Sequence, residues 1–173
     1  MSKVFITGVF GSGKTTFAKK YSSETGLSFI NFDEMFKYEQ AKDKTYIKDI
    51  YNNFPEHFII DAIPFSQNWE LFIEYIQKYE DVCVIFTICS NPIEWLNRIM
   101  RFKQAYMKVK PETVADLTKS YFEQYANMYY KNLKSIEEMV DFKIFDTSTN
   151  EYISRTELYI RIDWAKEVYK EVK

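Results

Sequence analysis

The residues best suited to chemistry form one short segment near the amino terminus. Residues 8–15 read Gly-Val-Phe-Gly-Ser-Gly-Lys-Thr, which fits the pattern G-x-x-x-x-G-K-[ST] at every defined position. Glycines let the backbone approach an anion closely, and the loop amides and the following helix N-terminus then point at phosphate oxygens. In such a loop Lys14 reaches the β- and γ-phosphates, and the hydroxyl of Thr15 ligates Mg²⁺. The residues expected to hold the nucleotide phosphates are Gly8, Gly11, Ser12, Gly13, Lys14, Thr15 and Thr16.

The composition and the setting of this segment both argue against a chance match. The chain has only four glycines, and three of them lie inside the segment. An apolar, β-branched run precedes it and a helical pattern follows it, which is the strand–loop–helix setting that the pattern requires. The sequence therefore predicts a phosphate-binding loop at the first turn between a strand and a helix.

Charge is informative at two further places. Asp61 follows the apolar run 58–60, and a carboxylate beside a buried strand is costly unless it meets a metal or a lysine. Between residues 98 and 110 there are five cations and no acid, although the net charge of the chain is −2. Guanidinium groups suit both stacking on a base and stabilising charge on a transferring phosphoryl group. The five cations are Arg98, Arg101, Lys103, Lys108 and Lys110.

The elements that must position these residues alternate between strand and helix. Strands are expected over residues 3–7, 27–32, 58–63, 82–89 and 142–147. Helical patterns cover 14–22, 69–79 and 92–101, and further helices begin after Pro111 and after the capping pair Ser154 and Glu157; 34–53 is polar, mixed and helical. Continuous apolar strands that alternate with helices predict an α/β fold, in which a five-stranded parallel sheet is covered on both faces.

In this order the features resemble the small P-loop kinases related to adenylate kinase, shikimate kinase, gluconate kinase and the kinase half of polynucleotide kinase. The resemblance covers most of the chain, although only the phosphate loop is specific by itself. It implies a three-layer P-loop NTPase fold with a short helical lid. The whole chain, 1–173, would be one kinase domain, with an acceptor-binding segment at 34–57 and the lid at 98–115.

The resemblance also implies roles around the reacting phosphate. Asp33 would orient or deprotonate the acceptor hydroxyl, with Glu34 as the second candidate; a helix N-cap is the alternative for Asp33. Asp61 would be a Walker B aspartate that contacts Mg²⁺ through water, or else a turn residue at a strand end. Arg98 would pack on the adenine and Arg101 would face the phosphates, unless both belong to a solvated helix face.

Asp146 and Thr147 would lie in the loop that passes the adenine edge, where a simple polar turn is an equal alternative. The function implied is ATP- and Mg²⁺-dependent transfer of the γ-phosphate to a hydroxyl of a nucleoside, a nucleotide or another small polar metabolite. A monophosphate kinase grips its acceptor phosphate with arginines, but no arginine precedes Arg98 and Phe65 stands where the family has one. A hydroxyl acceptor is therefore the better expectation.

Two other functions stay open at this point. One is a kinase for the 5′-hydroxyl of a nucleic acid or for a modified base within one, in which aromatic residues would stack bases. The residues available for such stacking are Tyr38, Tyr46, Tyr51 and Phe54. The other is a P-loop ATPase or regulator that transfers phosphate to no acceptor. Binding to oligonucleotides that weakens with salt would mark the first, and ATP hydrolysis indifferent to any acceptor would mark the second.

Composition also limits the size of the core, the partners and the cellular compartment that can be expected. A chain of 173 residues with 46% hydrophobic and 28% charged residues can bury one core, and its pI of about 5.6 gives no general attraction to nucleic acid. No apolar run approaches the roughly 18 residues of a membrane span, so no membrane association is expected. Cys83 and Cys89 lie about 20 Å apart along one predicted strand, beyond disulfide reach, which indicates a cytoplasmic protein. His57 is expected to be a loop residue.

Overall fold

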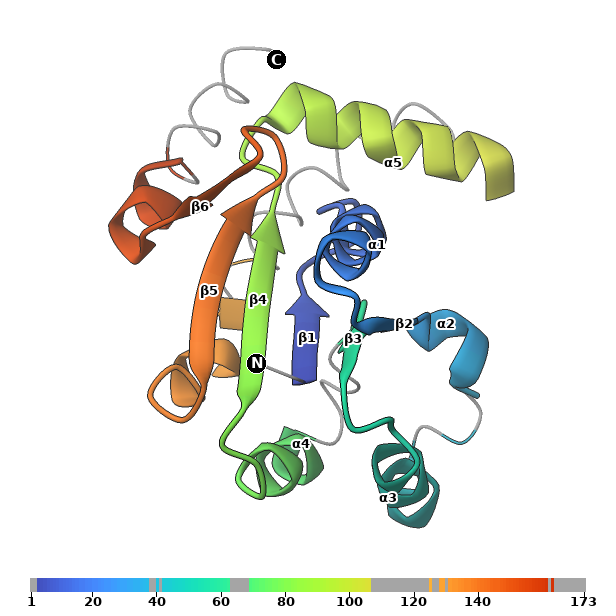
Figure 1. The fold of residues 1–173 in the computed structure, drawn as a ribbon. Coiled ribbons are helices and arrows are strands. Elements are labelled where there is room, and N and C mark those ends of the chain that lie inside the picture. The colour runs from blue at the N-terminus through green and yellow to red at the C-terminus, as the bar shows by residue number, and fades with distance from the viewer. Residues whose placement is uncertain are drawn as a thin grey trace.

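The computed structural model describes residues 3–37, 40, 42–62, 69–106, 125, 128, 129, 131–161 and 163 (Figure 1). The helix expected after Pro111 lies largely outside these residues, and so do positions 107–115 of the predicted lid, Tyr38 and Phe65. Within the described part of the chain, none of the helices combines the length and the apolar character needed to cross a membrane.

The centre of the fold is one six-stranded sheet with the order β2-β3-β1-β4-β5-β6 (Figure 1). Its strands are β1 (Lys3–Thr7), β2 (Ser28–Ile30), β3 (Phe58–Ile60), β4 (Val82–Ile88), β5 (Asp141–Asp146) and β6 (Glu151–Ile153). The first five pair in parallel, which confirms the predicted α/β class. The sixth strand was not predicted, and it pairs antiparallel with β5.

The extra strand has a local cause. Asn150 adopts a left-handed conformation with φ of 59°, which lets the chain reverse direction after β5. Glu151–Ile153 then returns along the sheet edge, too short and too polar to show a strand pattern in the sequence. The capping pair after it is confirmed, because the Ser154 amide donates to Glu157 and the Glu157 amide donates to Ser154 Oγ at the start of helical residues 155–161.

Alternating side chains of the strands build two cores, one on each face of the sheet. Val4 and Ile6 of β1 pack with Phe17 of helix α1 (Lys14–Thr25) on one face. Phe5 faces the opposite side with residues of α3 (Lys44–Asn52) and α4 (Trp69–Ile76). This period of two is that of strands buried on both faces, and it produces three layers of structure.

Side chains that accept hydrogen bonds from backbone amides mark where two of the helices begin. The predicted mixed segment 34–53 resolves into two short helices, α2 (Phe32–Met35) and α3, and Asp43 caps α3 by accepting from two backbone amides. Helix α5 (Pro92–Tyr106) is longer than expected, and the Asn91 side chain accepts from the amides of Ile93 and Glu94 at its start.

The strand order decides where a ligand can bind. Since β1 lies between β3 and β4, the chain moves to one side of β1 for β2 and β3 and to the other side for β4 and β5. Ligands of open α/β sheets bind outside the carboxyl ends of the strands at such a reversal. In this protein the reversal is at the carboxyl end of β1, where the predicted phosphate loop begins, and α5 lies beyond it (Figure 1).

Candidate active site

The loop after β1 takes a backbone shape that depends on its glycines. Gly11 and Gly13 have φ of 79° and 90°, and Gly13 is the N-cap residue of α1. A side chain at Gly8 would put its Cβ 2.4 Å from the carbonyl oxygen of Thr87 in β4. The loop therefore sits directly against a central strand, and the predicted motif supplies glycine where the contact leaves no room.

Side chains from two other elements support this loop. Ser12 Oγ lies 2.9 Å from Thr87 Oγ1, and Thr87 Oγ1 also donates to the carbonyl oxygen of Thr7 at 3.0 Å. The hydroxyl of Thr147, after β5, lies 2.8 Å from the carbonyl oxygen of Ser12. The side chain of Ser12 is thus turned into the protein, and its backbone amide donates to the carbonyl oxygen of Val9 at 3.1 Å within the loop.

A cavity of about 640 Å³ opens above the loop. Four charged side chains that the sequence singles out line it: Lys14, Asp33, Asp61 and Arg98. They come from α1, α2, the end of β3 and α5, so the fold brings together residues from across the first hundred positions. Arg101 does not line this cavity; it lies three residues further along α5, and its side chain is exposed.

Lys14 is held within the loop. Its Nζ donates to the carbonyl oxygen of Val9 at 3.0 Å. Burial lowers the pKa of Lys14, while the nearby carboxylates of Asp61 and Asp33 act in the opposite direction. An ammonium group that has lost much of its hydration gains strongly from a phosphate oxygen placed beside it.

Asp61 connects the loop to the segment that carries Asp33. Thr15 Oγ1 donates to one carboxylate oxygen of Asp61 at 2.7 Å, and the Phe32 amide donates to the other at 3.0 Å. Mg²⁺ prefers a few hard oxygen ligands together with water and substrate phosphates, and Thr15 with Asp61 supplies such oxygens side by side. In the described residues no group of three His, Cys, Asp or Glu side chains forms a metal cluster.

Asp33 and Glu34 differ in their surroundings. Asn31, not Asp33, is the N-cap residue of α2, and its side chain donates to Glu34 at 2.6 Å. Asp33 instead lines the cavity and acts electrostatically on Lys14. Of the two carboxylates, Asp33 is the one that faces the phosphate loop.

A smaller cavity of about 260 Å³ shares Gly13, Thr16 and Arg98 with the first. Thr147, Lys20 and Asn150 also line it, and Lys20 Nζ donates to Asn150 Oδ1 at 3.3 Å. Arg98 lies where the two cavities meet and donates to Thr147 Oγ1 at 2.6 Å. Lys20 and Asn150 could not be predicted from the sequence as lining residues, because an exposed helix lysine and a turn asparagine carry no distinctive signal.

Asp146 supports the loop after β5 from inside the protein and lines neither cavity. Burial raises the pKa of this carboxyl, but hydrogen bonds from Ser148, Ser90 and Arg161 outweigh it, so the pKa lies below its ordinary value. Arg161 Nη1 lies 2.8 Å from Asp146 Oδ2. A nucleotide would therefore sense Asp146 only through the position of the loop and of Thr147.

Replacing Asp146 with asparagine should lower the free energy of unfolding at pH 7 by about 2–4 kcal/mol, because the buried carboxylate is lost to two hydroxyls and to the partly buried guanidinium of Arg161. Because folding lowers the pKa of the Asp146 carboxyl, the stabilisation that its ionised form provides is present above the ordinary pKa of 3.8. This stabilisation is lost as the pH falls below that value and the carboxyl is protonated. Urea unfolding at pH 7 and at pH 3 should show the difference between the two proteins shrinking in acid.

The matched control for this prediction is Asp141→Asn at the other end of β5, where a partly exposed ion pair with Lys143 is lost. That change should cost about 1 kcal/mol or less. Equal losses for Asp141→Asn and Asp146→Asn would contradict the role given to the buried network.

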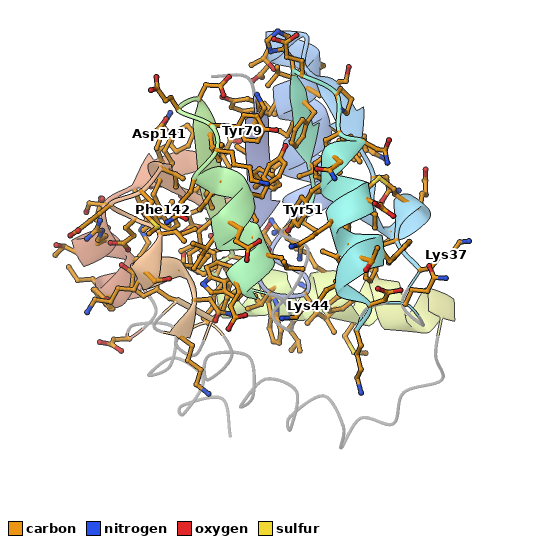
Figure 2. The ribbon with its side chains drawn as sticks, turned by 90° about the horizontal axis from the view of Figure 1, so that it is seen from below. Lys37, Lys44, Tyr51, Tyr79, Asp141 and Phe142 are labelled. Carbon is orange, nitrogen blue, oxygen red and sulfur yellow. The ribbon has the colours of Figure 1, made fainter. Side chains whose placement is uncertain are left out.

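The described residues include three of the four aromatic residues considered for base stacking, and these three pack within the fold. Tyr51 is buried, stacks on Tyr75 with ring centroids 4.7 Å apart, and Figure 2 shows it between α3 and α4. Phe54 packs against Phe58, and Tyr46 Oη accepts from the Lys37 amide. Tyr51 and Phe54 thus pack against α4, whereas the partly buried Tyr46 packs at the end of α2. These packing roles weaken the case for a nucleic-acid substrate.

Comparison with known proteins places this geometry among nucleotide-binding proteins. A protein-family profile described as an AAA domain matches residues 2–109. No match to a curated protein was found. Because the profile covers more than half of the sequence, the chain belongs to the AAA domain family.

Solved structures show the same fold at low sequence identity. Shikimate kinase from Bacteroides thetaiotaomicron is 16% identical with a TM-score of 0.55, and the alignment covers 98% of each chain. A gluconokinase from Sinorhizobium meliloti 1021 is 12% identical with a TM-score of 0.51, over 99% of this chain and 98% of that one. A structure from the PezAT toxin–antitoxin system of Streptococcus pneumoniae is 12% identical with a TM-score of 0.54, over 98% and 84%. The predicted resemblance to small P-loop kinases is confirmed at the level of the fold.

Proposed function

We propose that this member of the AAA domain family is an ATP- and Mg²⁺-dependent phosphotransferase that acts on a hydroxyl group of a nucleoside, a nucleotide or another small polar metabolite. The observation that carries the proposal is the shared cavity of Lys14 and Asp33. An NTPase needs the lysine, whereas a carboxylate that faces the phosphate loop from a separate helix is what an acceptor hydroxyl needs.

In the proposed reaction the loop amides and Lys14 hold the donor phosphates. The acceptor oxygen forms a bond to the γ-phosphorus, the bond from that phosphorus to the oxygen of ADP breaks, and the hydroxyl proton passes to Asp33. Thr15 and Asp61 are proposed to hold Mg²⁺, which would supply positive charge beside the phosphate oxygens. Catalysis rests mainly on positioning and on charge stabilisation.

The two arginines of α5 complete the proposed site. Arg98 lines both cavities and would contact the base and the phosphates at their junction. Arg101 is proposed to reach the transferring phosphoryl group. We assign acceptor binding to the segment 34–57. We also propose a cytoplasmic location, which is supported by the buried thiols of Cys83 and Cys89, neither of which forms a disulfide.

A second candidate function is a P-loop ATPase without an acceptor. The match to the AAA domain profile favours it, since that family description does not require a phosphate acceptor. The two functions differ in the nucleophile that Asp33 would face, which is an acceptor hydroxyl in the kinase and a water molecule in the ATPase.

The deciding measurement is ADP release from Mg-ATP with pooled acceptors: nucleosides, nucleotides, sugar acids, shikimate and 5′-hydroxyl oligonucleotides. One pool should raise turnover, and Asp33→Asn should lower that stimulated rate by about 10²-fold, the usual contribution of a positioned base. Asp141→Asn is the matched control and should leave the rate unchanged, since Asp141 pairs with Lys143 at the start of β5, at the opposite end of the sheet from the phosphate loop. If ATP is hydrolysed and no pool raises turnover above that basal rate, the ATPase function replaces the kinase.

A further inference from the structure

Trp95 joins helix α5 to the phosphate loop by a direct hydrogen bond. Its indole Nε1 donates to the carbonyl oxygen of Phe10 at 2.9 Å, and the side chain is only 2% exposed. Phe10 is the third residue of the loop motif. A buried indole N–H nearly always has a partner, and here the partner is the backbone of the loop itself.

The packing of α5 on the loop leaves no room for a side chain at the next residue, Gly11. A Cβ added to Gly11 would lie 2.9 Å from Trp95 Nε1 and 3.0 Å from Ile99 Cγ1. Trp95 and Ile99 are four residues apart and so lie on one face of α5, which therefore backs the loop. The glycine at position 11 is required by this packing as well as by its φ of 79°.

The hydrogen bond fixes the direction of one peptide group. In a trans peptide the carbonyl of one residue and the amide of the next point in opposite directions. Because the Phe10 carbonyl points at Trp95, the Gly11 amide points away from α5. If this peptide turned over, a carbonyl oxygen would replace an amide on the side where phosphate oxygens are to bind, and the loop would repel the anion.

We propose that Trp95 is a positioning residue for phosphate binding, which holds the Phe10–Gly11 peptide with its amide directed away from α5 and toward a bound phosphate. Thr147 acts in the same way at the carbonyl of Ser12, two residues further along. The loop is thereby ordered before the nucleotide arrives, and less affinity is lost in ordering it. This inference rests on the nucleotide-binding part of the proposed function and is independent of any acceptor.

The test compares Trp95→Phe with Trp69→Phe. Phenylalanine keeps an aromatic ring in either place but removes the indole N–H. Trp69 is the matched control, because its Nε1 donates to Ser135 Oγ at 3.4 Å rather than to the loop. The probe is Mg-pyrophosphate, which occupies a phosphate loop without needing an acceptor, and its Kd is measured by calorimetry.

Trp95→Phe should weaken pyrophosphate binding on the order of tenfold, the size expected when one ordering hydrogen bond is lost, and Trp69→Phe should leave the Kd unchanged. In turnover assays the effect should fall on KM more than on kcat. An unchanged Kd in a folded Trp95→Phe protein would overturn the proposal. Since the probe needs no acceptor, the result stands even if phosphate transfer itself is disproved.

A second readout is taken on the ¹⁵N-labelled parent protein. The indole N–H resonance of Trp95, identified by its loss in Trp95→Phe, should shift when pyrophosphate is added, and that of Trp69, identified by its loss in Trp69→Phe, should not. A Trp95 resonance that ignores saturating pyrophosphate would equally overturn the proposal, because a donor to the loop carbonyl must sense the occupied loop.

Discussion

Replacing Lys14 with alanine is expected to lower kcat/KM for Mg-ATP by about 10³-fold or more, since the cation that meets the β- and γ-phosphates is removed from a site where charge is poorly hydrated. Burial already lowers the pKa of Lys14, and the carboxylates of Asp61 and Asp33 remain in the cavity of the variant. Two carboxylates without the lysine would repel the nucleotide. The loss should therefore appear both in nucleotide affinity and in turnover.

Lys19→Ala is the matched control, because Lys19 lies on the same helix but its ammonium sits 5.7 Å from the centre of the Phe29 ring, on the exposed surface. ADP release and ATP binding by calorimetry should be unaffected by this change. If Lys14→Ala bound and turned over Mg-ATP like the parent protein, the phosphate loop would not be the nucleotide site.

Gly8→Ala should cost more than about 3 kcal/mol of folding free energy, an effect at the upper end for single substitutions. The added Cβ would lie 2.4 Å from the Thr87 carbonyl oxygen, and within 2.7 Å of the hydroxyl oxygens of Thr87 and Ser12. β4 is a fully buried strand paired on both sides, so its backbone cannot move away. A φ of 152° adds strain for any residue with a side chain.

Gly26→Ala serves as the control for Gly8→Ala. Gly26 caps the end of α1 with φ of 76°, and a Cβ there would meet nothing within 4 Å. Its cost should be limited to the left-handed conformation, about 1–2 kcal/mol. Urea unfolding of both variants gives the comparison, and a loss at Gly8 no larger than that at Gly26 would refute the close contact with β4.

Much of this architecture could be predicted from the sequence, because strands buried on both faces read as continuous apolar runs. The run at 82–89 became β4, and the run at 58–63 became β3 with Asp61 just beyond it. β6 could not be predicted, since its three residues are stabilised by pairing with β5 and by the left-handed turn at Asn150 rather than by an apolar pattern. Local sequence does not record such pairing.

The residues of the candidate site also differ in whether the sequence alone reveals them. Lys14 and Thr15 carry a motif whose spacing encodes the chemistry, so the sequence alone identified them. Trp95 carries none: an apolar helix position has the same appearance whether its N–H meets a loop carbonyl or a neighbouring side chain, and only the packing of α5 on Gly11 separates the two. Asp146 likewise reads as a turn residue until its buried partners are seen.

The lengths of the strands have a consequence for how the protein behaves in concentrated solution. The two strands that border the sheet, β2 and β6, have three residues each, whereas the seven-residue, fully buried β4 is enclosed by β1 and β5. A short edge strand offers few free backbone groups with which a strand of another chain could pair. A chain cut after α5 would lack β5, so β4 would become a long, apolar edge strand. We therefore expect such a fragment to aggregate while the whole chain stays dispersed.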